Sequence, residues 1–181
     1  RMETIPAKIP YLTNLLDDHF KVSGGDDGRL QIGFVWASDH GTSYRRKICP
    51  LKCLSKLFDI KHTTFYGMQF GKDADEFNTY IDRKNVKNLE LHLGDFAHTA
   101  AIIDQMDLII SIDTYIVHLA GAMRKPVWVM LPYVADWRWF LDRPDSPWYP
   151  SARLFRQTSP GDWPRLVTEV KTALIQFSAN M

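Results

Sequence analysis

Two short apolar runs, separated by one helix-length segment, constrain the fold of this chain more than any other feature. The first run covers residues 107–112 and the second covers 126–131, and both are apolar at almost every position. Strands that are buried on both faces of a parallel sheet have this composition, whereas strands with one solvent-facing side alternate. The segment between the runs, residues 114–123, fits a crossover helix. These elements predict a β–α–β unit inside a parallel sheet.

The rest of the chain continues the alternation of strands and helices. Further strands are predicted at 30–36, 62–67, 89–93 and 153–157. Further helices are predicted at 50–59, 73–81, 95 or 96 to 106, and 162–177. Alternating strands and helices favour parallel pairing with helices on both faces of the sheet. We therefore predict an α/β, Rossmann-like, doubly wound parallel sheet of about six strands.

A Gly- and Asp-rich stretch at residues 23–28 divides the sequence unequally. Such stretches are typical of turns and flexible linkers. We predict that residues 1–28 are a linker or the tail of a preceding domain, and that 29–181 form one domain. The chain opens on Arg1-Met2 and has 181 residues, so we expect a fragment of a longer protein.

The overall charge points to no large polyanionic partner. The formal net charge is +1, and no run of Lys or Arg is long enough to form a polybasic tail. No apolar stretch reaches the roughly 20 residues that a membrane-spanning helix needs. The N-terminus also lacks the long apolar core of a signal peptide. We expect a cytoplasmic protein that binds neither nucleic acid nor membrane.

The end of the 107–112 run carries the strongest candidate for a ligand site. Asp113 and Thr114 stand where the next helix is predicted to begin, and His118 follows Thr114 by about one helical turn. Ligands of open α/β sheets bind at the carboxyl ends of strands, and helix N-termini attract anions. Small residues at 119–122 allow a close approach of helix to sheet, or of backbone to ligand. We predict a diphosphate site here; the simpler alternative is a capped helix with a core histidine.

Two other strand ends carry further candidates. The first predicted strand ends at Trp36, itself a candidate for the ligand site, and the loop after it contains Arg46 and Lys47, adjacent cations that suit a diphosphate. After the second strand, Tyr66 and Gln69 are candidates for contacts with a base or ribose. The alternatives are a solvated basic loop in the first case and ordinary loop residues in the second.

Several motifs that would indicate other chemistry are absent. There is no G-x-G-x-x-G, no G-x-x-x-x-G-K-[ST] and no G-x-S-x-G in the sequence. The histidines lack the spacing of metal ligands. We therefore expect no metal and no cofactor.

The segment 132–150 is unusually rich in aromatic residues. Many exposed aromatic side chains are costly unless they pack on something. Three interpretations are open: the loop packs on itself, it forms a wall of the ligand pocket, or it packs against another domain.

Several blocks, in a fixed order, carry a family resemblance. Gly33–Ala37, followed by a basic loop, and the long block Asp107–Pro132 resemble the C-terminal donor domain of heptosyltransferase-like GT-B glycosyltransferases (family 9). A closer resemblance, to bacterial glycosyltransferases fused to tetratricopeptide repeats, rests on four blocks, the first of which ends the long block. These are Leu131-Pro132, Asp136–Trp139, Asp145–Pro150 and Arg153–Gln157. Together the blocks span about residues 30 to 175.

The resemblance implies a two-domain enzyme in which this chain is the second, sugar-nucleotide-binding half. Asp113, Thr114 and the amide of Tyr115 would contact the diphosphate and sugar of the donor, with His118 nearby. Heptosyltransferases commonly have glycine where this chain has Tyr115, so the identity of the sugar stays open.

The implied activity is transfer of a sugar from a nucleoside-diphosphate sugar to an acceptor hydroxyl. Arg46 or Lys47 would neutralise the leaving diphosphate, and the general base would lie on the preceding domain, so this fragment alone would be inactive. Two alternatives remain: half of a GT-B sugar-nucleotide epimerase, or a non-catalytic module that binds a nucleotide or a protein partner.

Overall fold

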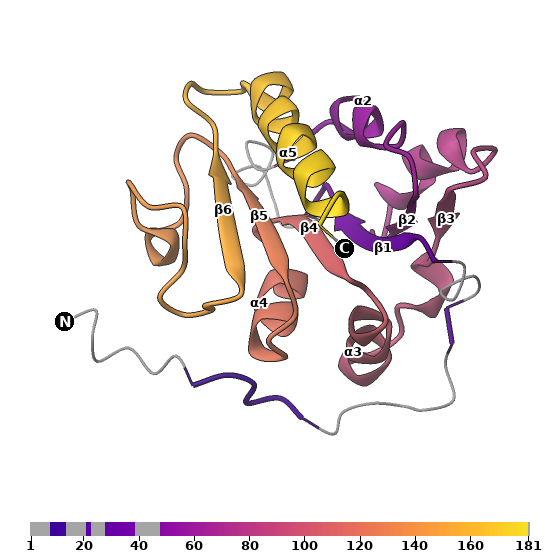
Figure 1. Ribbon diagram of the computed structural model, residues 1–181, viewed down its shortest axis with the longest axis horizontal. Coiled ribbons are helices and arrows are strands. Elements are labelled where there is room, and N and C mark those ends of the chain that lie inside the picture. The colour runs from indigo at the N-terminus through magenta and orange to yellow at the C-terminus, as the bar shows by residue number, and fades with distance from the viewer. Residues whose placement is uncertain (1–7, 14–20, 23–27, 39–47, 181) are drawn as a thin grey trace.

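A single sheet of six parallel strands forms the centre of the computed structural model, which describes residues 8–13, 21–22, 28–38 and 48–180 (Figure 1). The strands are β1 (Leu30–Val35), β2 (Thr63–Gly67), β3 (Val86–Asn88), β4 (Leu108–Ile112), β5 (Val127–Leu131) and β6 (Ala152–Arg156). Their order across the sheet is β3-β2-β1-β4-β5-β6. The predicted doubly wound parallel sheet is confirmed.

Helices cover both faces of the sheet (Figure 1). An apolar core lies between the sheet and each layer of helices. On one face lie α2 (Leu51–Leu54) and α5 (Trp163–Ser178), and on the other lie α3 (Phe96–Asp104) and α4 (Tyr115–Ala122). Alternate residues of the strands point into the two cores because successive side chains on a strand face opposite ways. None of the helices in the described part of the chain combines the length and apolarity of a bilayer span.

Strand β4 explains the apolar run that the sequence shows at 107–112. It pairs with β1 on one side and with β5 on the other, and all five of its residues are buried. The chain runs outward from β1 to β3 and then returns to β4, so the direction of winding reverses between β1 and β4. Such a reversal leaves a crevice at the carboxyl ends of the two strands, where open α/β sheets bind ligands.

The third strand lies earlier than predicted. Residues 89–93 are not a strand; the strand is β3, and a 3-10 turn, η5 (Glu90–His92), follows it. The side chain of Asn88 accepts a hydrogen bond from the backbone N–H of Glu90 at 2.9 Å, which turns the chain away from the sheet. Leu91 is consequently 94% exposed, although the alternating pattern had suggested a strand.

Two predicted helices differ from expectation: one is shorter, and the other is a 3-10 helix instead of an α-helix. The segment 50–59 contains α2 and a 3-10 turn, η3 (Ser55–Leu57). The segment 73–81 contains only 3-10 structure, η4 (Ala74–Tyr80). The long α5 lies within one residue of its predicted bounds, and Asp162 caps it by accepting from the backbone N–H of Arg165 at 3.3 Å.

The residues predicted as a linker or tail make contacts with the domain where they are described. The backbone N–H of Tyr11 donates to the carbonyl of Ala122, at the end of α4, at 3.0 Å. Val22 is buried, and its N–H donates to the side chain of Gln105 at 2.8 Å. These segments therefore lie against the α3 and α4 layer, and their assignment to a preceding domain stays a prediction.

A loop segment lies along the outer side of β6. The carbonyl of Pro144 accepts a hydrogen bond from the N–H of Leu154 at 2.7 Å, and Asp145 forms an isolated antiparallel bridge with Arg153. The loop between β5 and β6 thus covers part of one border of the sheet.

Candidate functional site

A cavity of about 860 Å³ lies where β1, β2 and β4 end, at the point where the winding of the sheet reverses. The residues that line it come from four segments: the ends of β1 and β2, the start of α4, and the loop between β5 and β6. They are Val35, Ala37, Ser38, Met68, Gln69, Phe70, Asp113, Thr114, Tyr115, Ile116, His118, Asp136, Trp137, Arg138, Trp148 and Tyr149. The cavity is therefore where the topology of an open α/β sheet predicts a ligand.

The first turn of α4 supplies hydrogen-bond donors at this cavity. Thr114 is the N-cap residue, with extended backbone angles, but its side chain makes no capping hydrogen bond. Its hydroxyl instead lies 3.1 Å from the hydroxyl of Ser111. The first N–H groups of a helix generally lack partners within it. In α4 the N–H of Val117 donates to the carbonyl of Thr114 at 3.1 Å, which leaves those of Tyr115 and Ile116 for a ligand, and the helix dipole adds positive potential there. This end of the cavity can therefore bind an anion.

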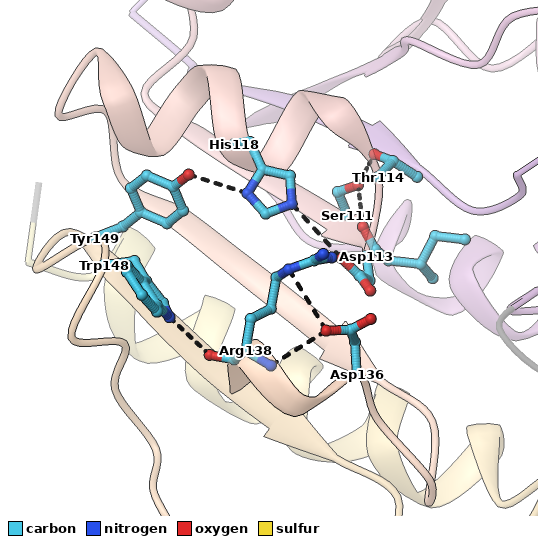
Figure 2. A network of polar contacts seen from close by, with 9 residues as sticks. Ser111, Asp113, Thr114, His118, Asp136, Arg138, Trp148 and Tyr149 are labelled. Atoms are coloured by element: carbon cyan, nitrogen blue, oxygen red, sulfur yellow. Dashed lines mark hydrogen bonds and ion pairs between the residues drawn. The ribbon is translucent and has the colours of Figure 1, made fainter. Parts of the chain in front are cut away.

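His118 stands at the centre of a polar network that crosses the cavity wall (Figure 2). Its Nδ1 lies 3.0 Å from the hydroxyl of Tyr149, and its Nε2 lies 3.8 Å from a carboxylate oxygen of Asp113. The imidazole stacks on Trp139, with ring centroids 5.6 Å apart and an interplanar angle of 16°. The ring is thereby fixed by contacts on one face and at both nitrogens.

Two pKa shifts define the charge state of this network. Burial lowers the pKa of His118; the carboxylate of Asp113 opposes that effect and the positive charge of Arg138 adds to it. Burial also raises the pKa of Tyr149, and a hydrogen bond with the side chain of Tyr11 adds to the rise. At neutral pH the imidazole is uncharged and the phenol keeps its proton, so His118 acts as a hydrogen-bonding group rather than a cation.

The glycine of α4 makes room for a protein ring and not for a ligand. A Cβ atom built on Gly121 would lie 2.4 Å from the ring of Tyr149. Neither of the two reasons considered for small residues at 119–122, a close approach of the helix to the sheet or of its backbone to a ligand, is observed at this position; a side chain of the loop between β5 and β6 packs on the helix instead. The absence of a side chain on Gly121 thus lets Tyr149 reach His118.

The loop between β5 and β6 forms the opposite wall of the cavity. Asp136 caps a 3-10 turn, η6 (Trp137–Trp139), by accepting from the N–H of Arg138 at 3.1 Å. The indole N–H of Trp148 donates to the carbonyl of Arg138 at 2.9 Å. Of the three interpretations of this loop, self-packing and a wall of the cavity are both observed: the rings of Trp137 and Trp148 pack edge-on with centroids 6.4 Å apart, and both residues line the cavity.

The structure brings together some of the predicted site residues and separates others. Asp113, Thr114, Tyr115, His118 and Gln69 all line the cavity. The side chain of Gln69 is directed to the protein, since its carbonyl oxygen accepts from the N–H groups that end β1, the nearer at 2.9 Å.

Two candidates are not at the cavity, and two lie outside the described residues. The side chains of Trp36 and Tyr66 are 1% and 0% exposed and do not line the cavity, so they do not join the other candidates there, and their contact with a donor stays a prediction. Tyr66 donates its hydroxyl hydrogen bond to Gln31 within the core. Arg46 and Lys47 lie outside the described residues.

Sequence reasoning did not select Arg138 or Tyr149 as site residues, although both line the cavity. Arg138 lies in a block that carries the family resemblance, and its neighbours in the sequence are aromatic. The charge of Arg138 among apolar residues was the signal that could have identified it. Among the described residues, no three His, Cys, Asp or Glu side chains gather as a metal site would require, and metal independence stays a prediction.

The lowered pKa of His118 predicts that acid destabilises the protein through this residue. The unfolded chain binds a proton near the ordinary histidine pKa of about 6.5, whereas the folded protein binds it only at lower pH. Stability should therefore fall as the pH drops below about 6.5. Urea unfolding at two pH values on either side should show a smaller difference for His118→Gln than for the unchanged protein. The exposed His92→Gln should keep the original difference; an equal reduction in both variants contradicts the assignment.

Comparisons with known proteins identify solved structures with a similar fold, but they do not show the family to which this chain belongs. No protein-family model matches the chain. Among curated proteins, the chain is similar to protein FlbA of Caulobacter vibrioides, with 27% identity over 156 residues. That match covers 83% of this chain and 26% of FlbA, so the chain spans about a quarter of that relative.

Solved structures of heptosyltransferases share the fold. ADP-heptose lipopolysaccharide heptosyltransferase II of E. coli has a TM-score of 0.56 and 19% identity, over 83% of this chain and 48% of that chain. The E. coli heptosyltransferase WaaC with ADP has a TM-score of 0.57 and 13% identity, over 84% and 44%. A glycosyltransferase of family 9 from Veillonella parvula has a TM-score of 0.58 and 14% identity, over 85% and 46%. A further WaaC structure contains ADP-2-deoxy-2-fluoro heptose.

This chain therefore has a heptosyltransferase-like α/β fold. It spans less than half the length of each of these solved proteins. At these levels of identity the likeness establishes the fold, while substrate and activity belong to the proposal that follows.

Proposed function

We propose that this chain is the donor-binding domain of a glycosyltransferase and that its cavity holds the diphosphate of a nucleoside-diphosphate sugar. The observation that carries the proposal is the position of the α4 N-terminus, which opens into a cavity at the reversal of a doubly wound sheet. The fold is also that of WaaC, whose solved structures contain ADP and an ADP-linked sugar.

The chemistry of the cavity suits stabilisation of a leaving diphosphate. In glycosyl transfer, negative charge builds on the diphosphate as the bond to the sugar breaks. The N–H groups and dipole at the start of α4, with the hydroxyl of Thr114, are directed at such charge without reorganisation. His118 is uncharged and adds a hydrogen bond. In this proposal the amide of Tyr115, the first residue of α4, makes the backbone contact that the resemblance implies.

The remaining parts of the reaction lie outside the described residues. The general base and the acceptor site belong, in this proposal, to a preceding domain of the same protein. The cation of the loop after β1, Arg46 or Lys47, is a further proposed contact. A fusion to tetratricopeptide repeats, a bacterial source and a cytoplasmic location complete the proposal.

Calorimetric titration of the chain with ADP, UDP and GDP and their sugars tests donor binding directly. We expect one of these nucleotides to bind, and Thr114→Val to weaken that binding by roughly 10-fold, because one hydrogen bond to a charged group is lost. Thr172→Val, which removes an exposed hydroxyl of α5 that bonds only to its own helix, is the matched control and should leave the affinity unchanged.

Three outcomes decide between the proposal and its alternatives. If the folded chain binds none of these nucleotides at millimolar concentration, and Thr114→Val has no effect, donor binding is refuted. Release of epimerised donor by the intact protein without an acceptor would replace the transferase proposal with an epimerase. Binding without turnover by the intact protein, across donors and acceptors, would favour a non-catalytic module.

A further inference from the structure

The described residues that line the cavity carry more negative than positive charge, which disfavours an anionic ligand. Asp113 and Asp136 both line it, and Asp113 is 8% exposed. Because burial keeps His118 uncharged, Arg138 is the one permanent cation among the described lining residues. A diphosphate placed between two carboxylates is repelled unless a cation pairs with it. The position of Arg138 therefore matters more than that of an isolated surface arginine.

Arg138 is held in place by contacts on its backbone and on its side chain. Its N–H is bound by Asp136 and its carbonyl by the indole of Trp148, at 3.1 and 2.9 Å. The guanidinium Nε lies 3.5 Å from the carboxylate of Asp136, and the group lies over the ring of Trp137, 5.9 Å from its centroid. Figure 2 shows the side chain extending from the loop toward His118.

This geometry leaves the charged end of Arg138 directed at the proposed ligand. The contact with Asp136 uses Nε, and the guanidinium carries two terminal nitrogens in addition. A guanidinium binds phosphate oxygens with parallel hydrogen bonds when it is held in one orientation. Its side chain is 37% exposed, so a ligand that enters the cavity can reach it.

We propose that Arg138 binds the diphosphate of the donor, so that the loop between β5 and β6 and the first turn of α4 hold it from opposite sides. This inference rests on the proposed function and names a residue for it. The pairing is electrostatic, so it acts on the phosphates and not on the nucleoside.

Two substitutions with different expected effects test whether Arg138 touches the ligand. Arg138→Ala should weaken binding of the cognate nucleoside diphosphate by roughly 10- to 100-fold, because hydrogen bonds to a charged group are lost. It should leave binding of the corresponding nucleoside unchanged. Asp136→Asn keeps an acceptor that can cap the turn but removes a negative charge, so binding of the diphosphate should stay equal or tighten. Both affinities are measured by calorimetry at two salt concentrations.

The matched control is Arg143→Ala, which changes another arginine of the same loop. Arg143 forms two hydrogen bonds with Asp145, at 2.7 and 2.8 Å, and does not line this cavity. It should leave the affinity for the nucleoside diphosphate unchanged.

The possible results separate this inference from the proposed function. If the unchanged chain binds a nucleoside diphosphate and Arg138→Ala binds it equally well, Arg138 has no contact with the phosphates while donor binding stands. If Arg138→Ala and Asp136→Asn weaken it alike, the pair only shapes the loop and the inference is wrong. If the unchanged chain binds no nucleoside diphosphate, the inference is overturned together with the proposed function.

Discussion

Replacing Trp139 with alanine should lower the free energy of unfolding by about 3–5 kcal/mol. Its indole is fully buried, and one face stacks on His118. Removing so large a ring leaves a cavity that the surrounding residues fill only in part, which adds to the lost burial of apolar surface. Urea unfolding monitored by circular dichroism measures the change. The same substitution should also weaken nucleotide binding, because the ring that holds His118 is gone.

Trp137→Ala is the control for this substitution, since it removes the same side chain two residues earlier. Trp137 is 73% exposed, so its loss should change the free energy of unfolding by no more than about 0.5 kcal/mol. Similar losses for the two variants would mean that the loop does not pack on α4 as described.

Gly121→Ala should destabilise the protein by about 2–3 kcal/mol, although alanine ordinarily favours a helix. The added methyl group would lie 2.4–2.5 Å from atoms of the Tyr149 ring, too close for van der Waals contact. Either the helix or the ring has to move, and movement of the ring breaks the 3.0 Å contact with His118. Thermal and urea unfolding of the variant measure the loss.

The same substitution in a Tyr149→Ala variant tests the cause of that loss. With Tyr149→Ala already present, the clash is removed, and Gly121→Ala should become neutral or stabilising because alanine has the higher helix propensity. Gly94→Ala is the control for the substitution itself. Its Cβ would lie 3.4 Å from the His98 ring, an ordinary contact, so the effect should be small. A loss in both backgrounds would place the strain elsewhere.

Those parts of the fold that depend on local pattern could be predicted from the sequence. The runs at 107–112 and 126–131 are apolar at almost every position because the corresponding strands, β4 and β5, are buried on both faces. The short β3 could not be placed, because its three residues carry little pattern and the apolar residues beyond it alternate in the same way as a strand. The side-chain contact of Asn88 that ends the strand depends on a turn, which the apolar pattern does not encode.

In the site too, residues that follow from local sequence pattern could be predicted, and residues brought in by long-range contacts could not. Asp113, Thr114 and His118 could be selected because strand end, helix start and helical spacing are all visible in the sequence. Arg138 and Tyr149 come from a loop that folds back onto α4, and that contact links residues about 20 to 30 apart. The positions of Trp36 and Tyr66 could not be predicted, because a strand end gives the position of a residue but not the side to which its ring turns; both rings lie in the core and not at the cavity.

Parallel sheets expose unpaired backbone groups at their two outer strands, where another chain can add by hydrogen bonding. Here β3, with three residues, offers little length for such addition. At the other border, Pro144 and Asp145 already occupy backbone positions beside β6. The loop that forms a wall of the cavity thus also protects the sheet from edge-to-edge aggregation, and loosening it would expose a template for self-association.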